Sequence, residues 1–261
     1  AGISNLGDEA ITLSDTTVAA SVLNTLDGNT SGTVNAGTVT TLTGAAADLN
    51  TAYDSSGISG LANEPVTLSD TTLAASVLNT LDGHTSGTID ASSVNTLTGS
   101  AADLITAYAS SGITGLGDEA VNVSSGTAST SQATTLAAAT SGIVTVTISD
   151  GDLSTLDGLT ETDNAYSITV SDGSVDAAAL NTLDGKTSVT VDASSVTTLT
   201  GTAAEANTAY ASSGISGLAN EAVTLSDTTL AVAVLNTLDG NTSGTIDASN
   251  ITTLTGAAAD L

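Results

Sequence analysis

The stretch that decides the fold is TTLAASVLNTLDGHTSGTI, residues 71–89. It aligns without a gap with TTLTGAAADLNTAYDSSGI, residues 40–58, so that the Thr-Thr-Leu start, the small residues after it, the apolar positions and the closing Ile fall in register. A unit this short cannot bury its own apolar face, so it must stack on its neighbours. Numbered by its second residue, the start recurs at Thr17, Thr41, Thr72, Thr96, Thr127, Thr147, Ser174, Thr198, Thr229 and Thr253.

The spacing of these starts alternates between 24 and 31 residues, except for steps of 20 and 27 in the middle of the chain. Alternate steps therefore make a 55-residue double repeat, with seven extra residues at 59–65, 114–120 and 216–222. We interpret these sevens as a loop inserted on alternate turns. The sequence predicts one continuous solenoid over residues 1–261, a fragment of a longer repetitive chain, with divergent middle turns at 124–176.

Each repeat combines strand and helix patterns. Short β-branched runs at 66–68, 88–90, 144–148 and 167–170 predict strands. Apolar residues spaced three or four apart, as in Ala74, Leu78 and Leu81, predict a short helix. Because strands joined by crossovers wind right-handed, we expect a right-handed, parallel β-solenoid-like coil of about ten turns, each with short strands and a short helix.

Local signals mark both ends of the predicted helices. Ser100 and Thr202 are each followed three residues later by an acid, an arrangement that satisfies backbone donors at a helix start. Leu-Asp-Gly recurs at the other end, and a left-handed glycine there is expected to close the helix. These glycines are Gly28, Gly83, Gly158, Gly185 and Gly240. The Asn that begins each Asn-Thr-Leu-Asp-Gly run is expected to satisfy backbone groups; it is found at Asn24, Asn79, Asn181 and Asn236.

Composition excludes several classes of function. Twenty-eight acidic residues stand against a single Lys or Arg, Lys186, for a net charge of −27. Nucleic acids and anionic membranes need clustered cations, so neither is an expected partner. No cysteine is present, which excludes disulfides and thiolate metal sites. No run of about 18 apolar residues predicts membrane insertion. Divalent cations are expected to screen the carboxylates.

Calcium is the one cofactor that the acidic pattern suggests. Aspartates beside tight turns recur with a second set of aspartates eight residues later, and hard cations prefer such oxygens. We predict weak calcium sites at Asp27, Asp82, Asp90, Asp184, Asp192, Asp239 and Asp247. The calcium-binding nonapeptide of parallel coils and the EF-hand loop are both missing from the sequence. Loose counter-ion binding is therefore the stronger expectation.

Catalytic constellations are missing from the sequence. The single histidine, His84, corresponds to Asn29, Lys186 and Asn241 in the other copies, so we read it as drift. The acid pairs Asp118–Glu119 and Asp152–Asp157 are expected to be solvated surface acids, and we do not expect an enzyme. A second surface pattern is a threonine grid like that of ice-binding solenoids, although β-branched Thr also simply suits strands. It would comprise Thr41, Thr43, Thr96, Thr98, Thr145, Thr147, Thr198, Thr200, Thr253 and Thr255.

Three runs carry a resemblance to a known family: ALNTLDGKTS at 179–188, TTLTGTAA at 197–204 and NTAY at 207–210. They resemble the repeat region of giant exported cell-surface proteins of marine cyanobacteria. The resemblance covers nearly the whole chain, with residues 124–165 the least similar part. It implies an extracellular or cell-surface, acidic, multi-repeat fibre or coat protein, and it brings no active-site residues.

These features together predict a structural extracellular protein that builds or decorates a filament, sheath or surface layer. Copies of itself, joined end to end or laterally, are the expected partners. The alternatives are a calcium-dependent adhesin stalk and an ice-binding solenoid.

Overall fold

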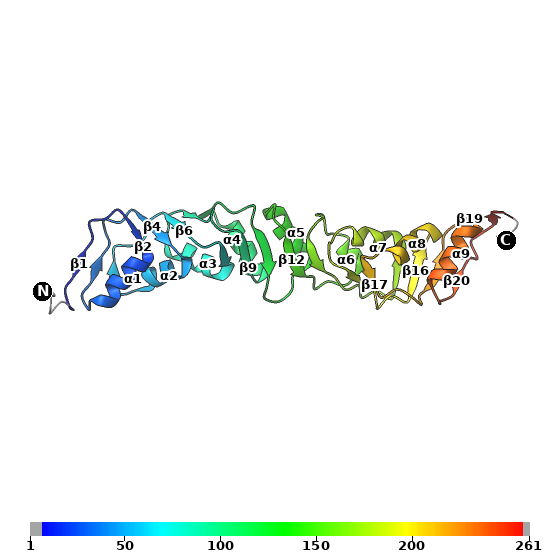
Figure 1. The fold of residues 1–261 in the computed structure, drawn as a ribbon, viewed down its shortest axis with the longest axis horizontal. Helices are drawn as coiled ribbons and strands as arrows, with labels where there is room; N and C mark the ends of the chain where they lie inside the picture. Colours follow the sequence, from blue (N-terminus) through cyan, green and yellow to red (C-terminus); the bar gives the residue numbers. More distant parts are fainter. Residues whose placement is uncertain (1–6, 258–261) are drawn as a thin grey trace. The chain divides into compact units, whose positions relative to one another are not determined.

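The structure of the protein is a computed structural model that describes residues 7–257. Short helices alternate with short strands along the chain (Figure 1). The helices are α1 (Ala20–Asn29), α2 (Ala46–Asp54), α3 (Ala75–His84), α4 (Ala101–Ala109), α5 (Thr130–Ala139), α6 (Leu153–Leu156), α7 (Ala177–Asp184), α8 (Ala203–Ala211) and α9 (Val232–Asn241).

The chain divides into two compact units. The first comprises residues up to 126 together with 139–142, and the second comprises 127–138 and 143 onward. The boundary falls inside the stretch 124–176, where the repeats diverge.

The strands of the first unit form three parallel sheets. Their orders are β1-β3-β5, β2-β4-β6-β8-β10 and β7-β9-β11. The strands are β1 (Ile11–Thr12), β2 (Thr17–Ala19), β3 (Val34–Asn35), β4 (Thr41–Gly44), β5 (Ile58–Ser59), β6 (Val66–Leu68), β7 (Thr72–Ala74), β8 (Ile89–Asp90), β9 (Thr96–Gly99), β10 (Ile113–Thr114) and β11 (Ala120–Val123).

The second unit contains the parallel strand sets β12-β13, β14-β16-β18-β20, β15-β17 and β19-β21. Its strands are β12 (Val144–Thr147), β13 (Ala165–Ser167), β14 (Ser174–Asp176), β15 (Val191–Asp192), β16 (Thr198–Gly201), β17 (Ile215–Ser216), β18 (Ala222–Leu225), β19 (Thr229–Ala231), β20 (Ile246–Asp247) and β21 (Thr253–Thr255). The predicted α/β architecture of repeated short strands and helices is therefore confirmed in both units.

Strand register explains the sequence period. Thr17 lies opposite Thr41, and Leu42 lies opposite Val66. Both pairs are 24 residues apart, so the chain returns to the same sheet after that distance, and we call each such return a turn. Ala128 forms a bridge with Ile148, which confirms the shorter step of 20 in the divergent middle.

The 31-residue step is not a turn with a loop added, and that interpretation was wrong. The strand that lies on β4 is β6, which follows after 24 residues, and the next Thr-Thr-Leu start, in β7, begins a different sheet. Residues 59–65 lead into β6 instead of forming a separate excursion. They also carry a glutamate, Glu64, that is only 4% exposed. A length difference alone cannot reveal whether extra residues are excluded from the stack or built into it.

The core is a column of small apolar residues at the same strand position. In the five-stranded sheet Val18, Leu42, Val66, Ile89 and Ile113 lie side by side, all of them buried. Each helix packs residues spaced three apart against this column, as Ala75, Leu78 and Leu81 do in α3. Side chains of this size fill the thin space between strand and helix, which explains why the chain uses almost no aromatic residues.

The predicted helix starts are confirmed, but the predicted glycine ends are wrong. Ser100 accepts a hydrogen bond from the backbone N–H of Asp103, and Thr202 and Glu205 form a full capping box. At the other end α3 runs through Gly83 to His84, and α1 and α9 likewise run through Gly28 and Gly240. None of the five glycines in Leu-Asp-Gly has a positive φ. The helix ends instead at a threonine held by the preceding turn, as described below.

Candidate functional site

Three glutamates in equivalent positions are buried, where surface acids were expected. Glu64, Glu119 and Glu221 are 4%, 1% and 1% exposed. The expectation that Glu119 is a solvated surface acid is therefore wrong. An acid is buried at this cost only when hydrogen bonds replace the lost water, so the partners of these carboxylates define the site.

Each buried carboxylate accepts a hydrogen bond from the tyrosine eleven residues earlier. The distances are 3.4 Å for Tyr53–Glu64 and 3.0 Å for Tyr210–Glu221, and Tyr108 contacts Glu119 in the same way. A backbone N–H two residues before the acid donates as well, from Ala62 at 2.8 Å, Gly117 at 2.8 Å and Ala219 at 2.9 Å. The acid thus closes its own loop and attaches it to the preceding helix.

The backbone carbonyl of the same glutamate binds the next turn. Thr85 donates its hydroxyl to the Glu64 carbonyl at 3.0 Å, and Gly87 packs directly on this carbonyl, where a Cβ would lie 2.4 Å from the oxygen. The same contact is made by the pairs Thr30–Glu9, Thr140–Glu119 and Thr242–Glu221. The helix before each Thr-Ser-Gly run ends there because this threonine takes an extended conformation, as at Thr30, Thr85 and Thr242.

Burial raises the pKa of the tyrosine phenols. It raises the pKa of Tyr53 to about 12 and that of Tyr210 to about 12, and the neighbouring glutamates act in the same direction because they repel a phenolate. The pKa of Tyr108 is raised by burial and by its hydrogen bond to Glu119, and burial raises the pKa of Tyr166 to about 12.

Alkaline pH should therefore unfold the protein. An unfolded tyrosine ionises near pH 10, whereas the folded phenols hold their protons until about pH 12. Their contribution to stability is complete below about pH 10 and is lost as the pH rises through about 12. Urea unfolding midpoints, followed by circular dichroism, should fall across this window. The phenolate absorbance should appear together with unfolding, and its appearance near pH 10 in a fully folded protein would contradict the prediction.

The predicted calcium ligands are used in two different ways. Asp27, Asp82 and Asp184 accept hydrogen bonds from a serine hydroxyl of the next turn, at 2.7, 2.7 and 2.6 Å. Those serines are Ser55, Ser110 and Ser212, and the glycine two residues after each packs against the carboxylate. The carboxylates therefore hold adjacent turns together, which does not require a metal ion.

The remaining predicted ligands lie at the surface or close to it. Asp90, Asp192 and Asp247 each accept a hydrogen bond from the backbone N–H two residues later, at 3.1, 3.0 and 3.0 Å. Hydrogen bonds to Ser92, Ser194 and Ser249 lower the pKa values of these three aspartates, so they stay charged. Asp239 is exposed. Residues 7–257 contain no group of three or more His, Asp or Glu side chains that could hold a metal ion, and calcium binding stays a prediction.

Four further aspartates, which the sequence analysis did not single out, cap a helix of the preceding turn. Asp70 accepts a hydrogen bond from the first backbone N–H of α2 at 2.8 Å, and Asp227 does the same for α8 at 2.8 Å. Asp150 and Asp172 cap α5 and α6 in this way. A carboxylate at a helix N-terminus is favourable in charge as well as in hydrogen bonding. The recurring Ser-Asp at 69–70, 149–150, 171–172 and 226–227 was the available signal.

Asparagines connect successive helices, as the sequence predicts. The side-chain amides of Asn24, Asn79 and Asn181 each donate to a backbone carbonyl of the next helix at 2.9 Å. The connection lies between helices and not at a bend. Asn236, in the last described helix, is exposed.

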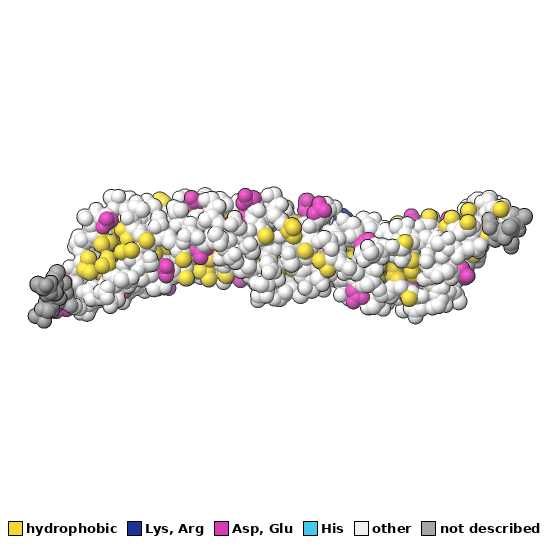
Figure 2. Space-filling view, in the orientation of Figure 1, with side chains coloured by type: hydrophobic (Ala, Val, Ile, Leu, Met, Phe, Trp, Pro, Cys, Tyr) yellow, Lys and Arg dark blue, Asp and Glu magenta, His cyan; other side chains and the backbone are white. Residues whose placement is uncertain are grey.

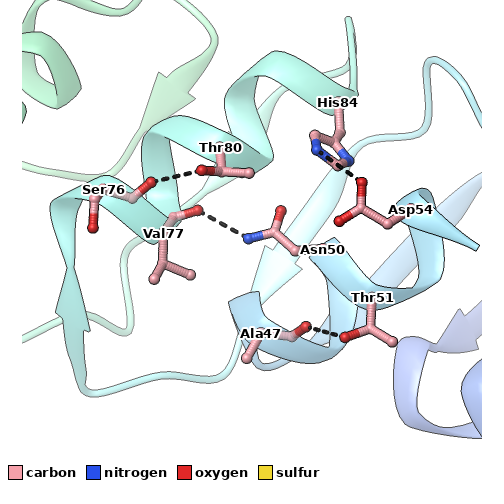
Figure 3. A network of polar contacts seen from close by, with 8 residues as sticks. All are labelled: Ala47, Asn50, Thr51, Asp54, Ser76, Val77, Thr80 and His84. Carbon is pink, nitrogen blue, oxygen red and sulfur yellow. Dashed lines mark hydrogen bonds and ion pairs between the residues drawn. The ribbon is translucent and has the colours of Figure 1, made fainter.

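The single histidine lies in this seam between helices. Figure 3 shows its ring next to Asp54, with Asn50 of α2 donating to the Val77 carbonyl of α3 nearby. The His84 Nε2 atom is 3.6 Å from the Asp54 carboxylate, and the ring meets that of Tyr53 edge to face at 5.8 Å. These contacts again bridge adjacent turns.

The threonine columns are interrupted. In the five-stranded sheet the outward positions run Ala19, Thr43, Thr67, Asp90 and Thr114. The column that begins at Thr72 and Thr96 continues with Ala120. A continuous hydroxyl grid is therefore not formed at these positions.

Comparison with known protein families, with curated proteins and with solved structures gave no match to this chain. The resemblance to exported cyanobacterial repeats consequently stays a prediction. Among the helices of residues 7–257, none has both the length and the apolar composition needed to cross a membrane.

Proposed function

We propose that this chain is a repeat segment of an extracellular structural protein that builds or decorates a filament, sheath or surface layer. In this proposal each unit winds as a right-handed, parallel coil of stacked turns, as crossovers between parallel strands favour. One observation carries the proposal: the polar residues that recur from repeat to repeat contact the adjacent turn. Glu64 with Tyr53 and Thr85, and Asp82 with Ser110, are examples.

The use of these residues distinguishes a structural repeat from a binding or catalytic one. A repeated binding site would keep its recurring side chains free for a ligand, whereas here the recurring carboxylates, amides and hydroxyls are hydrogen-bonded within the chain. On the face that Figure 2 shows, acidic groups are scattered singly among uncharged polar atoms. Such a surface suits a spacer with loosely bound cations.

The alternative functions have less support. A calcium-dependent stalk needs several ligands at one point, but Asp27, Asp82 and Asp184 face serines of the next turn. Ice binding needs a regular hydroxyl face, but Asp90 and Ala120 interrupt the threonine columns.

Electron microscopy of the native material tests the proposal. Cells that produce the chain, labelled with gold-conjugated antibodies against the folded repeats, should carry label on extracellular fibres or on a surface layer, with a fine axial repeat. Label confined to the cell interior, or discrete particles released singly into the medium, would overturn the proposal. Cells that lack the gene are the matched control for the antibody.

A further inference from the structure

Two strands near the ends of the described chain each have one unpaired edge. Among residues 7–257, β21 pairs only with β19, and β1 pairs only with β3. Leu254 in β21 is 45% exposed, whereas its equivalents Leu42, Leu97 and Leu199 are completely buried. The edge of β21 therefore presents both an apolar side chain and unused backbone groups, which makes it a template for another strand.

The chain itself shows what covers such an edge. The strands equivalent to β21 are β4, β9 and β16, and they are covered by β6, β11 and β18, with Leu42 opposite Val66, Leu97 opposite Val121 and Leu199 opposite Val223. The covering segments read EPVTL at 64–68, EAVNV at 119–123 and EAVTL at 221–225. The segment that contains β1 reads EAITL at 9–13, which is the same motif.

The unpaired edge of β1 is the one that this pairing requires. Inside the first unit β6 lies between β4 and β8, with Val66 opposite both Leu42 and Ile89. β1 has the β8-like partner, because Ile11 lies opposite Val34 in β3. The edge left over is the one with which β6 contacts β4. Each open edge therefore matches the other in motif and in side.

We propose that β1 of one copy pairs in parallel with β21 of a second copy, with Ile11 opposite Leu254 and Thr12 opposite Thr255. This register copies the internal pairs Leu42–Val66 and Thr43–Thr67. The inference rests on the proposed function and names its partner, a second copy of this chain. The contact is heterologous, so each added copy leaves one edge of each kind open and the assembly grows.

Charge opposes this contact and gives it a characteristic salt dependence. Asp8 and Glu9 are exposed beside β1, and each copy carries a net charge of −27. Repulsion between exposed charges is screened by salt. Association should therefore strengthen as sodium chloride is raised.

Complementary edge variants give the sharpest test. Sedimentation velocity of the unaltered chain, over a wide concentration range in high salt, should show open-ended oligomers. Leu254→Lys blocks one edge and Ile11→Lys the other, because an unpaired ammonium group would be buried at the contact, so each variant alone should be monomeric. An equimolar mixture of the two should form a heterodimer and nothing larger. Val22→Lys, at a 50% exposed position on α1, should associate like the unaltered chain.

Cysteine cross-linking tests the register independently. The chain has no cysteine, so a Thr12→Cys, Thr255→Cys variant carries only the two introduced thiols. Residues opposite each other on paired strands lie within reach of a disulfide. Mild oxidation should give a ladder of covalent oligomers, and a Thr12→Cys, Thr253→Cys control should give at least about tenfold less, because its thiols lie two residues out of register.

Three results would overturn the inference: a monomeric unaltered chain in high salt, continued association of both Lys variants, or no heterodimer in their mixture. Its failure differs from failure of the proposed function. Labelled extracellular fibres together with a monomeric chain would reject strand pairing between copies only. Heterodimers together with intracellular label would reject the structural role only.

Discussion

Replacing Glu119 with alanine should lower the free energy of unfolding by about 2–4 kcal/mol, because three donors lose their acceptor inside the protein. These donors are the Tyr108 hydroxyl and the backbone N–H groups of Gly117 and Asp118. The glutamate is 1% exposed, so water cannot replace the lost carboxylate without opening the structure. Urea unfolding followed by circular dichroism measures the effect.

Two controls separate this effect from a general loss of charge. Glu119→Gln keeps an acceptor oxygen of nearly the same shape and should cost only about 1 kcal/mol. Asp118→Ala removes an exposed acid from the neighbouring position and should change stability by less than about 0.5 kcal/mol. Equal losses for Glu119→Ala and Asp118→Ala would show that the buried carboxylate does not hold the loop.

A methyl group at Gly87 should cost about 2–3 kcal/mol, since an ordered backbone must move to admit it. The added Cβ would lie 2.4 Å from the carbonyl oxygen of Glu64 and 2.7 Å from that of Asn63. These atoms belong to the preceding turn, so the substitution separates two turns. The thermal midpoint of Gly87→Ala, compared with that of the unaltered chain, gives the result.

Gly83 provides the matched control four residues away. It lies within α3, and a Cβ there would meet nothing within 4 Å. Gly83→Ala should therefore stabilise the protein by about 0.5–1 kcal/mol, because alanine favours a helix and loses less backbone entropy on folding. If both variants behaved alike, the close approach of turns at Gly87 would be disproved.

The elements and their approximate period were predictable from local patterns. Strands at Val66–Leu68 and Ile89–Asp90 follow from β-branched alternation, and the helix from Ala75 follows from its apolar face. The caps at Ser100 and Thr202 follow from a hydroxyl and an acid three residues apart. Each of these signals acts within a few residues, so the sequence displays it directly.

Errors arose where a contact spans a whole turn. Gly83 was expected to end a helix, but the helix ends at Thr85, whose hydroxyl binds the Glu64 carbonyl 21 residues earlier. Glu119 was expected at the surface, because an acid next to Asp118 looks solvated. Its partner, Tyr108, is eleven residues away, and the same Tyr-to-Glu spacing in three copies was a signal that could have been used.

The sequence by itself determined that one unit repeats, that its core is made of small apolar side chains, and that the chain is strongly acidic. Only the tertiary structure decided which strand lies on which, because Thr41 and Thr72 look equivalent while Leu42 in fact lies opposite Val66. It also decided which carboxylates are buried, which bind the next turn and which remain in solvent. The physical reason is that pairing and burial depend on what the adjacent turn presents. In a repetitive chain similar residues occur in every turn, so similarity alone cannot identify the partner.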